Sequence, residues 1–183
     1  GGEKLSEYHI EKVRQTYPEI EIINGYGPTE NTTFSLTYNI KDQDFTSVIP
    51  IGKPLNNRTA YILDGETKLS PVGVIGEIYL GGDGVSIGYL NQPELTNEKF
   101  FKDPFSKESN SRLYRTGDLG RWKPDGNIEY LGRIDEQVKI RGYRIELGEI
   151  ESVLNEINSI KQSVVLAHET NEGSKRLVGY VVS

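Results

Sequence analysis

Residues Gly132–Glu151 read GRIDEQVKIRGYRIELGEIE, and this stretch decides how the chain divides into domains. Within it, Gln137–Ile140 alternates between polar and apolar side chains as a strand does, and Tyr143–Ile145 continues the pattern after Gly142. Leu147–Ile157 then places apolar residues three and four positions apart, which is typical of an amphipathic helix. We therefore predict that a second, smaller domain begins here.

Two further strands are expected after this helix, over Ile160–Ala167 and Arg176–Val182. The resulting β-α-β-β order predicts a small α+β domain over residues 137–183, preceded by a hinge at 132–136. A segment this short is close to the lower limit for a self-sufficient core. Residues 1–131 are expected to belong to a larger α/β domain.

Short elements separated by Gly, Pro and Asp clusters are expected within residues 1–131. Helices are predicted over Ser6–Tyr17 and Pro93–Phe100, and a loop over Gly25–Glu30. The predicted strands are Glu19–Asn24, Thr32–Asn39, Arg58–Leu63, Gly76–Leu80, Leu113–Thr116 and Asn127–Tyr130. This order indicates part of a βα layer together with a meandering β region.

Composition excludes several classes of protein. The 183 residues carry a formal net charge of −6, so the chain is a poor partner for nucleic-acid phosphates. Cysteine is absent, which rules out disulfides and zinc-thiolate sites. The sequence contains no run of about 18 apolar residues, so no membrane-spanning helix is predicted. The first residues do not resemble a signal peptide, so we expect a cytoplasmic location, and the lack of Met leads us to expect that the chain begins inside a longer polypeptide.

Two sequence patterns point to chemistry that their surroundings do not support. Gly84–Gly88 matches G-x-S-x-G, but the nucleophile elbow of hydrolases needs a helix directly afterwards, and Gly88–Pro93 does not read as a helix. Gly82, Gly84 and Gly88 also miss the dinucleotide-binding spacing. The chain's two histidines, His9 and His168, are too few for a histidine-rich metal site.

The stretch Asn24–Glu30 (NGYGPTE) places three useful groups on one tight loop. The ring of Tyr26 can stack on a base, and the hydroxyl of Thr29 can donate to a phosphate. The carboxylate of Glu30 is a hard ligand that suits Mg²⁺. The alternative is a plain turn with a surface glutamate.

The stretch Tyr114–Leu119 (YRTGDL) ends a predicted strand with Asp118. An ionised aspartate only accepts hydrogen bonds, so it could bind both hydroxyls of a ribose, although a simple turn-forming role is the alternative. Further on, Arg133 and the segment Lys139–Arg144 gather cations in an otherwise acidic chain. They suit phosphate oxygens, or a solvated charged hairpin.

Taken together, four stretches resemble, in order, four core motifs of the adenylate-forming enzymes, specifically the amino-acid adenylation domains of nonribosomal peptide synthetases. They are NGYGPTE, GEIYLGGDGVSIGYLNQPELTNEKF, YRTGDLGRW and GRIDEQVKIRGYRIELGEIE. The resemblance covers nearly the whole chain. It implies an α/β plus α+β fold, the C-terminal part of the adenylate-forming enzyme fold: a distorted β-barrel and βα layer of the large domain, followed by an incomplete small domain.

The resemblance also implies a reaction. A parent protein would use Mg²⁺ and ATP to form an aminoacyl-AMP, then load the amino acid as a thioester on the phosphopantetheine of a carrier domain, in secondary metabolite biosynthesis. The implied partners are carrier and condensation domains of the same synthetase. Two alternatives stay open: a fragment of an acyl-CoA ligase or stand-alone carrier-protein ligase, and a nucleotide-binding module without catalysis.

The resemblance first implies which residues contact the nucleotide. The resemblance places Tyr26 against the adenine, Thr29 on phosphate and Glu30 on Mg²⁺. It places Asp118 on the ribose diol and Arg133 near the ribose or phosphates.

The remaining implied roles concern movement and the substrate. Asp135 would be the hinge, Gly142 would line the pantetheine path, and Arg144 would meet the nucleotide phosphates. The residues implied to line the side-chain pocket are Gly1, Gly25, Thr33 and Phe34. This uncharged set resembles that of valine-activating domains.

Three parts of the family pattern have no match here: the glycine-rich phosphate loop, the aspartate that binds the substrate ammonium group, and the catalytic lysine. Lys139 belongs to a different motif and does not take over the lysine's role. We therefore assign no catalytic residue and expect the isolated chain to be inactive. Unpartnered sheet edges also lead us to expect poor stability or association.

Overall fold

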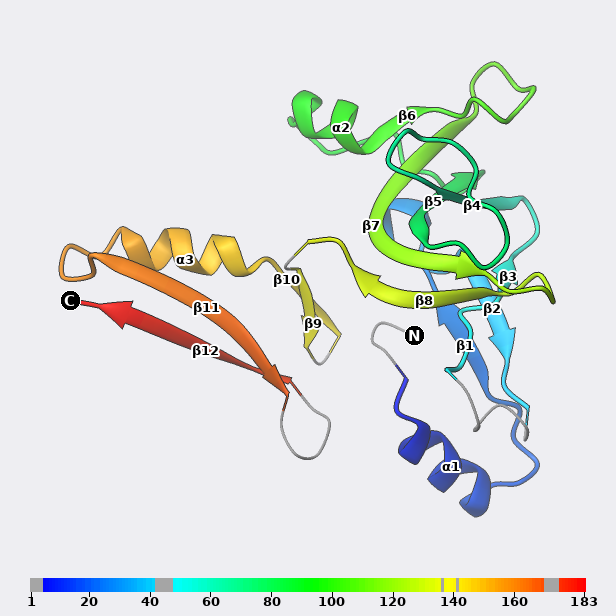
Figure 1. Ribbon diagram of the computed structural model, residues 1–183, viewed down its shortest axis with the longest axis horizontal. Helices are drawn as coiled ribbons and strands as arrows, with labels where there is room; N and C mark the ends of the chain where they lie inside the picture. The colour runs from blue at the N-terminus through cyan, green and yellow to red at the C-terminus, as the bar shows by residue number, and fades with distance from the viewer. Residues whose placement is uncertain (1–4, 42–47, 136, 141, 170–174) are drawn as a thin grey trace. The chain divides into compact units, whose positions relative to one another are not determined.

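The computed structural model describes residues 5–41, 48–135, 137–140, 142–169 and 175–183 (Figure 1). The chain forms two compact units, whose main spans are Glu7–Ile134 and Asp135–Ser183. The division falls inside the stretch predicted as a hinge, residues 132–136. Each unit is described by itself.

The first unit begins with α1 (Glu7–Thr16), one residue shorter at each end than expected. Ile10 is its buried side chain, while Tyr8 and Val13 are exposed. Arg14 donates a hydrogen bond to the carbonyl of Ile40, so the helix is linked to a segment 26 residues further along the chain.

A three-stranded antiparallel sheet follows, in the order β1-β2-β3. Its strands are β1 (Ile23–Tyr26), β2 (Leu36–Asn39) and β3 (Lys53–Pro54). The prediction that Gly25 and Tyr26 lie in a loop was wrong, because they pair with Thr37 and Leu36. β2 starts at Leu36 rather than Thr32, since Thr32 has a φ of 49° and breaks the extended backbone.

The larger sheet of this unit has five strands, in the order β4-β5-β7-β6, with β8 also paired to β7. The elements of this region are β4 (Arg58–Leu63), β5 (Gly76–Gly82), α2 (Pro93–Lys99), β6 (Phe100–Lys102), β7 (Arg112–Trp122) and β8 (Ile128–Arg133). All of these pairings are antiparallel. Among the described strands this sheet does not close on itself. It is consistent with part of the barrel that we expected.

β7 is far longer than the Leu113–Thr116 strand that we predicted. Figure 1 shows it bending along its length, with β6 beside its first half and β8 beside its second. Against β5, Arg115 pairs with Tyr79 and Leu119 pairs with Glu77, so β7 advances four residues where β5 advances two. This is a bulge, a feature that bends a strand and re-aims its side chains.

Apolar side chains from both sheets form the main core. Its buried members are Leu36, Ile51, Ala60, Ile62, Ile78, Leu80 and Ile128. Tyr26, Trp122 and Tyr130 pack against this group. Each fully buried aliphatic side chain contributes about 1.5–3 kcal/mol, so this core holds β1, β5 and β8 in fixed positions.

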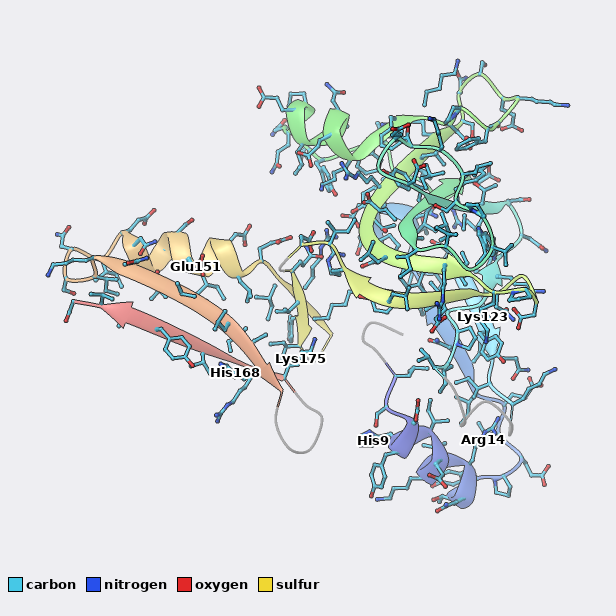
Figure 2. The ribbon with its side chains drawn as sticks, viewed as in Figure 1. His9, Arg14, Lys123, Glu151, His168 and Lys175 are labelled. Carbon is cyan, nitrogen blue, oxygen red and sulfur yellow. The ribbon has the colours of Figure 1, made fainter. Side chains whose placement is uncertain are left out.

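The second unit consists of two antiparallel ribbons and one helix. One ribbon is β9 (Val138–Ile140) with β10 (Tyr143–Ile145), and the other is β11 (Gln162–Glu169) with β12 (Lys175–Val182). α3 (Leu147–Asn155) packs on β11 and carries Glu151, which is labelled in Figure 2. Glu151 accepts a hydrogen bond from the amide of Val165 at 2.8 Å. The observed order is β-β-α-β-β rather than the predicted β-α-β-β, because the chain reverses at Gly142 and Tyr143–Ile145 pairs back on Val138–Ile140.

Candidate functional site

The bulge of β7 carries Asp118, a residue that is 5% exposed and whose carboxylate accepts hydrogen bonds from Tyr26 and Arg133. The hydroxyl of Tyr26 donates to Oδ2 at 2.5 Å, and Nη1 of Arg133 donates to Oδ1 at 2.9 Å. The strand register explains the second contact, because Asp118 on β7 pairs with Arg133 on β8. We call Tyr26, Asp118 and Arg133 the Asp118 cluster. The structure thus brings together three residues that were singled out from separate motifs.

Tyr26 acts as a hydrogen-bond donor in this cluster. Burial raises the pKa of its hydroxyl well above the usual value, and the negative charge of Asp118 raises it further. The phenol therefore keeps its proton at neutral pH. Its ring centroid lies 6.2 Å from that of Tyr130, which closes one side of the cluster.

Two residues that sequence reasoning missed hold the bulge in place. Thr116 donates its hydroxyl to the carbonyl of Ile78 at 2.7 Å and accepts the amide of Asp118 at 3.0 Å. The buried carboxylate of Glu77 accepts the amide of Gly117 at 2.9 Å and both of its oxygens bond Nε of Arg115. The signal for Glu77 was its place in an apolar strand, since a buried carboxylate is rare unless it is paired.

Glu30 lies on a single 3-10 turn, Thr29–Asn31, and is 7% exposed. The hydroxyl of Tyr89 donates to its Oε1 at 2.7 Å, and the hydroxyl of Tyr114 lies 3.4 Å from that of Tyr89. Burial raises the pKa of Tyr89, and the hydrogen bonds to Tyr114 and Glu30 add to the shift. We call Glu30, Tyr89 and Tyr114 the Glu30 cluster. Sequence reasoning assigned no role to Tyr89.

The loop that carries Glu30 is tightly packed against its own chain. A Cβ at Gly27 would lie 2.5 Å from the carbonyl oxygen of Thr33 and 2.7 Å from the amide of Ser35, so only glycine is accommodated here. Asn31 adds a hydrogen bond to the hydroxyl of Ser35 at 2.9 Å. Thr29 is exposed on the same turn, next to Glu30.

Two of the predicted pocket residues lie against each other. A Cβ at Gly25 would come within 2.8 Å of the Phe34 ring, so the missing side chain makes room for that ring. Phe34 is 44% exposed, and Thr33 beside it is also exposed, with a φ of 62°. The fourth predicted member, Gly1, lies outside the described residues.

The remaining predicted residues belong to the second unit. Asp135 accepts a hydrogen bond from the amide of Gln137 at 3.2 Å. Gly142 occupies the turn between β9 and β10 with a φ of 80°, and Arg144 on β10 is exposed opposite Lys139. Their assigned roles stay predictions.

A divalent cation can be tested against the donors that are present. Within the described parts of the chain, no three His, Cys, Asp or Glu residues gather as a ready metal site. His9 lies on α1 of the first unit and His168 on β11 of the second (Figure 2). Mg²⁺ is commonly held by one or two carboxylates together with water and substrate phosphates. The single carboxylate of Glu30 therefore fits Mg²⁺ that arrives with a polyphosphate.

Among the helices of the described residues, none combines the length and the apolar character that crossing a bilayer requires.

Comparison with known proteins places these clusters in a family context. Residues 1–90 match the AMP-binding enzyme family. Over 182 residues the chain is 59% identical to tyrocidine synthase 3 of Brevibacillus parabrevis, and over 182 residues it is 56% identical to gramicidin S synthase 2 of Brevibacillus brevis. Each match covers 100% of this chain, but the chain spans only 3% and 4% of those two proteins.

Solved structures give the same result at the level of the fold. A nonribosomal peptide synthetase protein containing adenylation and PCP domains, bound to a vinylsulfonamide inhibitor, superimposes with a TM-score of 0.92 at 34% identity. The match covers 99% of this chain and 32% of that chain. A four-domain synthetase bound to AMP and glycine has a TM-score of 0.66 at 44% identity, over 99% of this chain and 13% of that one. These matches confirm the fold class expected from the sequence.

Proposed function

We propose that this segment supplies nucleotide-binding loops to an amino-acid-activating ligase, because the chain belongs to the AMP-binding enzyme family as part of a nonribosomal peptide synthetase adenylation domain. In the first step, the carboxylate of an amino acid attacks the α-phosphorus of ATP, which gives an aminoacyl-AMP and pyrophosphate. In the second step, the thiol of a phosphopantetheine arm attacks the acyl carbon and releases AMP.

The arrangement of the Asp118 cluster carries this proposal. Tyr26 donates to one oxygen of Asp118 and Arg133 donates to the other. An ionised carboxylate only accepts hydrogen bonds, which suits recognition of the hydroxyls of a ribose. Because Arg133 and Tyr26 hold the carboxylate in one orientation, little ordering is needed when the nucleotide binds. The proposed role of Tyr26 against the adenine uses its ring, while its hydroxyl keeps Asp118 in place.

The Glu30 turn is proposed to serve the phosphates. Magnesium, when bound, neutralises charge on the phosphate oxygens during adenylation. Glu30 would hold this ion, and the exposed hydroxyl of Thr29 would donate to a phosphate oxygen. Arg133 would approach the ribose or the phosphates from β8.

Residues of the second unit are proposed to act in the change between the two steps. Asp135 would be the hinge, and Arg144 would meet the phosphates in one of the two arrangements. Gly142 would leave space for the phosphopantetheine arm, since its turn position carries no side chain. The carrier and condensation domains of the same synthetase are the proposed partners, and the similar solved protein contains a PCP domain.

The proposed substrate is a small aliphatic amino acid, with valine as the first candidate. The contact between Gly25 and Phe34 gives an apolar wall, and Thr33 adds no charge. Gly1 would complete this part of the pocket. An apolar, uncharged wall favours burial of a branched aliphatic side chain over a charged one.

The direct test is ATP–pyrophosphate exchange by the adenylation domain that contains this segment, with each proteinogenic amino acid in turn. We expect the strongest exchange with valine. Exchange with fatty or aromatic carboxylic acids, but with no amino acid, would instead identify an acyl-CoA ligase. Nucleotide binding without exchange on any carboxylic acid would leave a non-catalytic binding module.

A further inference from the structure

Tyr89 contacts Glu30 and has no assigned role in the reaction. It comes from the segment between β5 and α2, far in sequence from the Glu30 turn. Its hydroxyl nevertheless reaches Oε1 of Glu30 at 2.7 Å. The same segment is tied to the turn a second time, because the amide of Ser86 donates to the carbonyl of Glu30 at 2.8 Å.

The backbone of Tyr89 is fixed by the first turns of α2. Its amide donates to Oγ1 of Thr96 at 2.9 Å. The preceding residue, Gly88, adopts a φ of 153°, and a Cβ there would lie 2.4 Å from the methyl carbon of Thr96. The close packing of Gly88 on Thr96 therefore fixes the position of the Tyr89 backbone.

The ring of Tyr89 is also fixed. It packs edge-on against Phe100, with the ring centroids 5.3 Å apart, and Phe100 packs in turn on Tyr114 at 5.0 Å. Phe100 and Tyr114 are both almost fully buried. The hydroxyl of Tyr89 thus stands at the end of an aromatic stack, where it donates to Glu30 at 2.7 Å and lies 3.4 Å from the hydroxyl of Tyr114.

We propose that Tyr89 is a positioning residue for the Glu30 carboxylate, holding it in the orientation in which it receives the divalent cation of the ATP complex. This inference rests on the proposed function, in which Glu30 is the metal-binding residue. Carboxylates that bind metals are themselves hydrogen-bonded, and loss of such an outer partner typically lowers metal affinity about 10–100-fold. In this proposal Tyr89 supplies such a partner and acts on the metal only through Glu30.

The test uses Tyr89→Phe in the adenylation domain that contains this segment, since this change removes the hydroxyl and keeps the ring on Phe100. Binding of a non-hydrolysable ATP analogue is measured by calorimetry at increasing Mg²⁺, and also without the metal. We expect the half-saturating Mg²⁺ concentration to rise about tenfold, with the metal-free affinity unchanged. In parallel, the Mg²⁺ requirement of ATP–pyrophosphate exchange should rise by the same factor.

The matched control is Tyr61→Phe, which removes another tyrosine hydroxyl of the same unit, 3.5 Å from Asp103, and should leave the Mg²⁺ requirement unchanged. Glu30→Gln separates the two hypotheses. If Glu30→Gln raises the Mg²⁺ requirement and Tyr89→Phe does not, the inference is wrong and the proposed metal role of Glu30 stands. If neither changes it, the metal role of Glu30 fails as well.

A purely structural role for Tyr89 has a different signature. It would weaken metal-free and metal-dependent binding equally, and that outcome would also overturn the inference. Should Tyr89→Phe fail to fold, Thr96→Val removes the hydroxyl that bonds the Tyr89 amide and leaves the Tyr89 hydroxyl itself in place. This variant should raise the half-saturating Mg²⁺ concentration by a smaller factor, and no rise would contradict the proposal.

Discussion

The two units of this chain differ in how they treat polar groups. In the first unit, buried carboxylates such as Asp118, Glu30 and Glu77 are held by donors inside an apolar core. In the described part of the second unit, the buried side chains are Gln137, Leu147, Ser163 and Val165. Two-stranded ribbons of this kind are marginal without further packing. The residues proposed to contact the nucleotide are therefore held in one orientation in the first unit, whereas Arg144 of the second unit is exposed.

The largest effect is expected when a donor is removed from the Asp118 cluster. Arg133→Ala leaves the buried Asp118 carboxylate without its cation, and breaking a buried pair in this way costs about 3–5 kcal/mol. We expect the free energy of unfolding of the first unit to fall by that amount, measured by hydrogen exchange of the β7 and β8 amides.

Arg121→Ala is the matched control for this change, since Arg121 also joins β7 to β8, through an ion pair with Glu129 at 2.7 Å. Its side chain is 41% exposed, against 12% for Arg133. The expected loss is therefore at most about 1 kcal/mol. Equal losses in the two variants would contradict the view that burial makes the Asp118 cluster special.

A second variant tests whether the bulge must be fixed for the site to work. Glu77→Gln keeps the shape of the side chain but weakens its bonds to Gly117 and Arg115. Loss of charge-assisted hydrogen bonds costs about 1.5–3 kcal/mol, so the Michaelis constant for ATP should rise roughly tenfold or more. Steady-state ATP–pyrophosphate exchange measures this. An unchanged constant would show that Asp118 does not depend on the bulge.

A third variant asks whether the second unit is energetically separate. Glu151→Gln weakens the hydrogen bond that α3 makes to the amide of Val165, at a cost of about 1 kcal/mol. Hydrogen exchange should quicken in β11 and β12, while amides of β7 stay protected. Faster exchange in β7 as well would mean that the two units unfold together.

The last effect is confined to alkaline pH and concerns the first unit. Burial, and then the negative charge of Glu77, raise the pKa of Tyr79 to about 12, above the value of about 10 for an exposed tyrosine. The folded state therefore keeps a proton that the unfolded state loses, and this contribution to stability is complete below pH 10 and lost as the pH rises to about 12. Tyr79→Phe should make the decline in unfolding free energy shallower across that window. Chemical denaturation at each pH provides the measurement.

Most of this architecture could be predicted from the sequence, because its strands alternate and its breaks contain Gly or Pro. Arg58–Leu63 and Tyr143–Ile145 were predicted with the bounds that the structure has. Two of the errors share a physical cause. We predicted a loop at Gly25 and the end of a strand at Thr116, yet Gly25 lies in β1 and β7 continues through a bulge to Trp122, because long-range strand pairing decided both.

The candidate site shows the same limit. Asp118, Tyr26 and Arg133 could be singled out because each lies in a motif with local chemical meaning. No role could be assigned to Tyr89, and the place of Glu77 in an apolar strand indicated only that this carboxylate needed a partner. Their contacts with Glu30 and Gly117 join segments that are far apart in the sequence. Sequence patterns report local geometry, and these contacts are not local.

Equilibrium binding is the most direct test of the claim that Asp118 is a preorganised ribose site. The adenylation domain that contains this segment is titrated with AMP and with 2′,3′-dideoxy-AMP, which lacks both ribose hydroxyls. Asp118→Asn should weaken binding of AMP by about 2 kcal/mol, roughly 30-fold, and should leave the already weak binding of dideoxy-AMP unchanged. Equal affinity of the variant and the unmodified domain for AMP, or an equal loss for both nucleotides, would contradict the account.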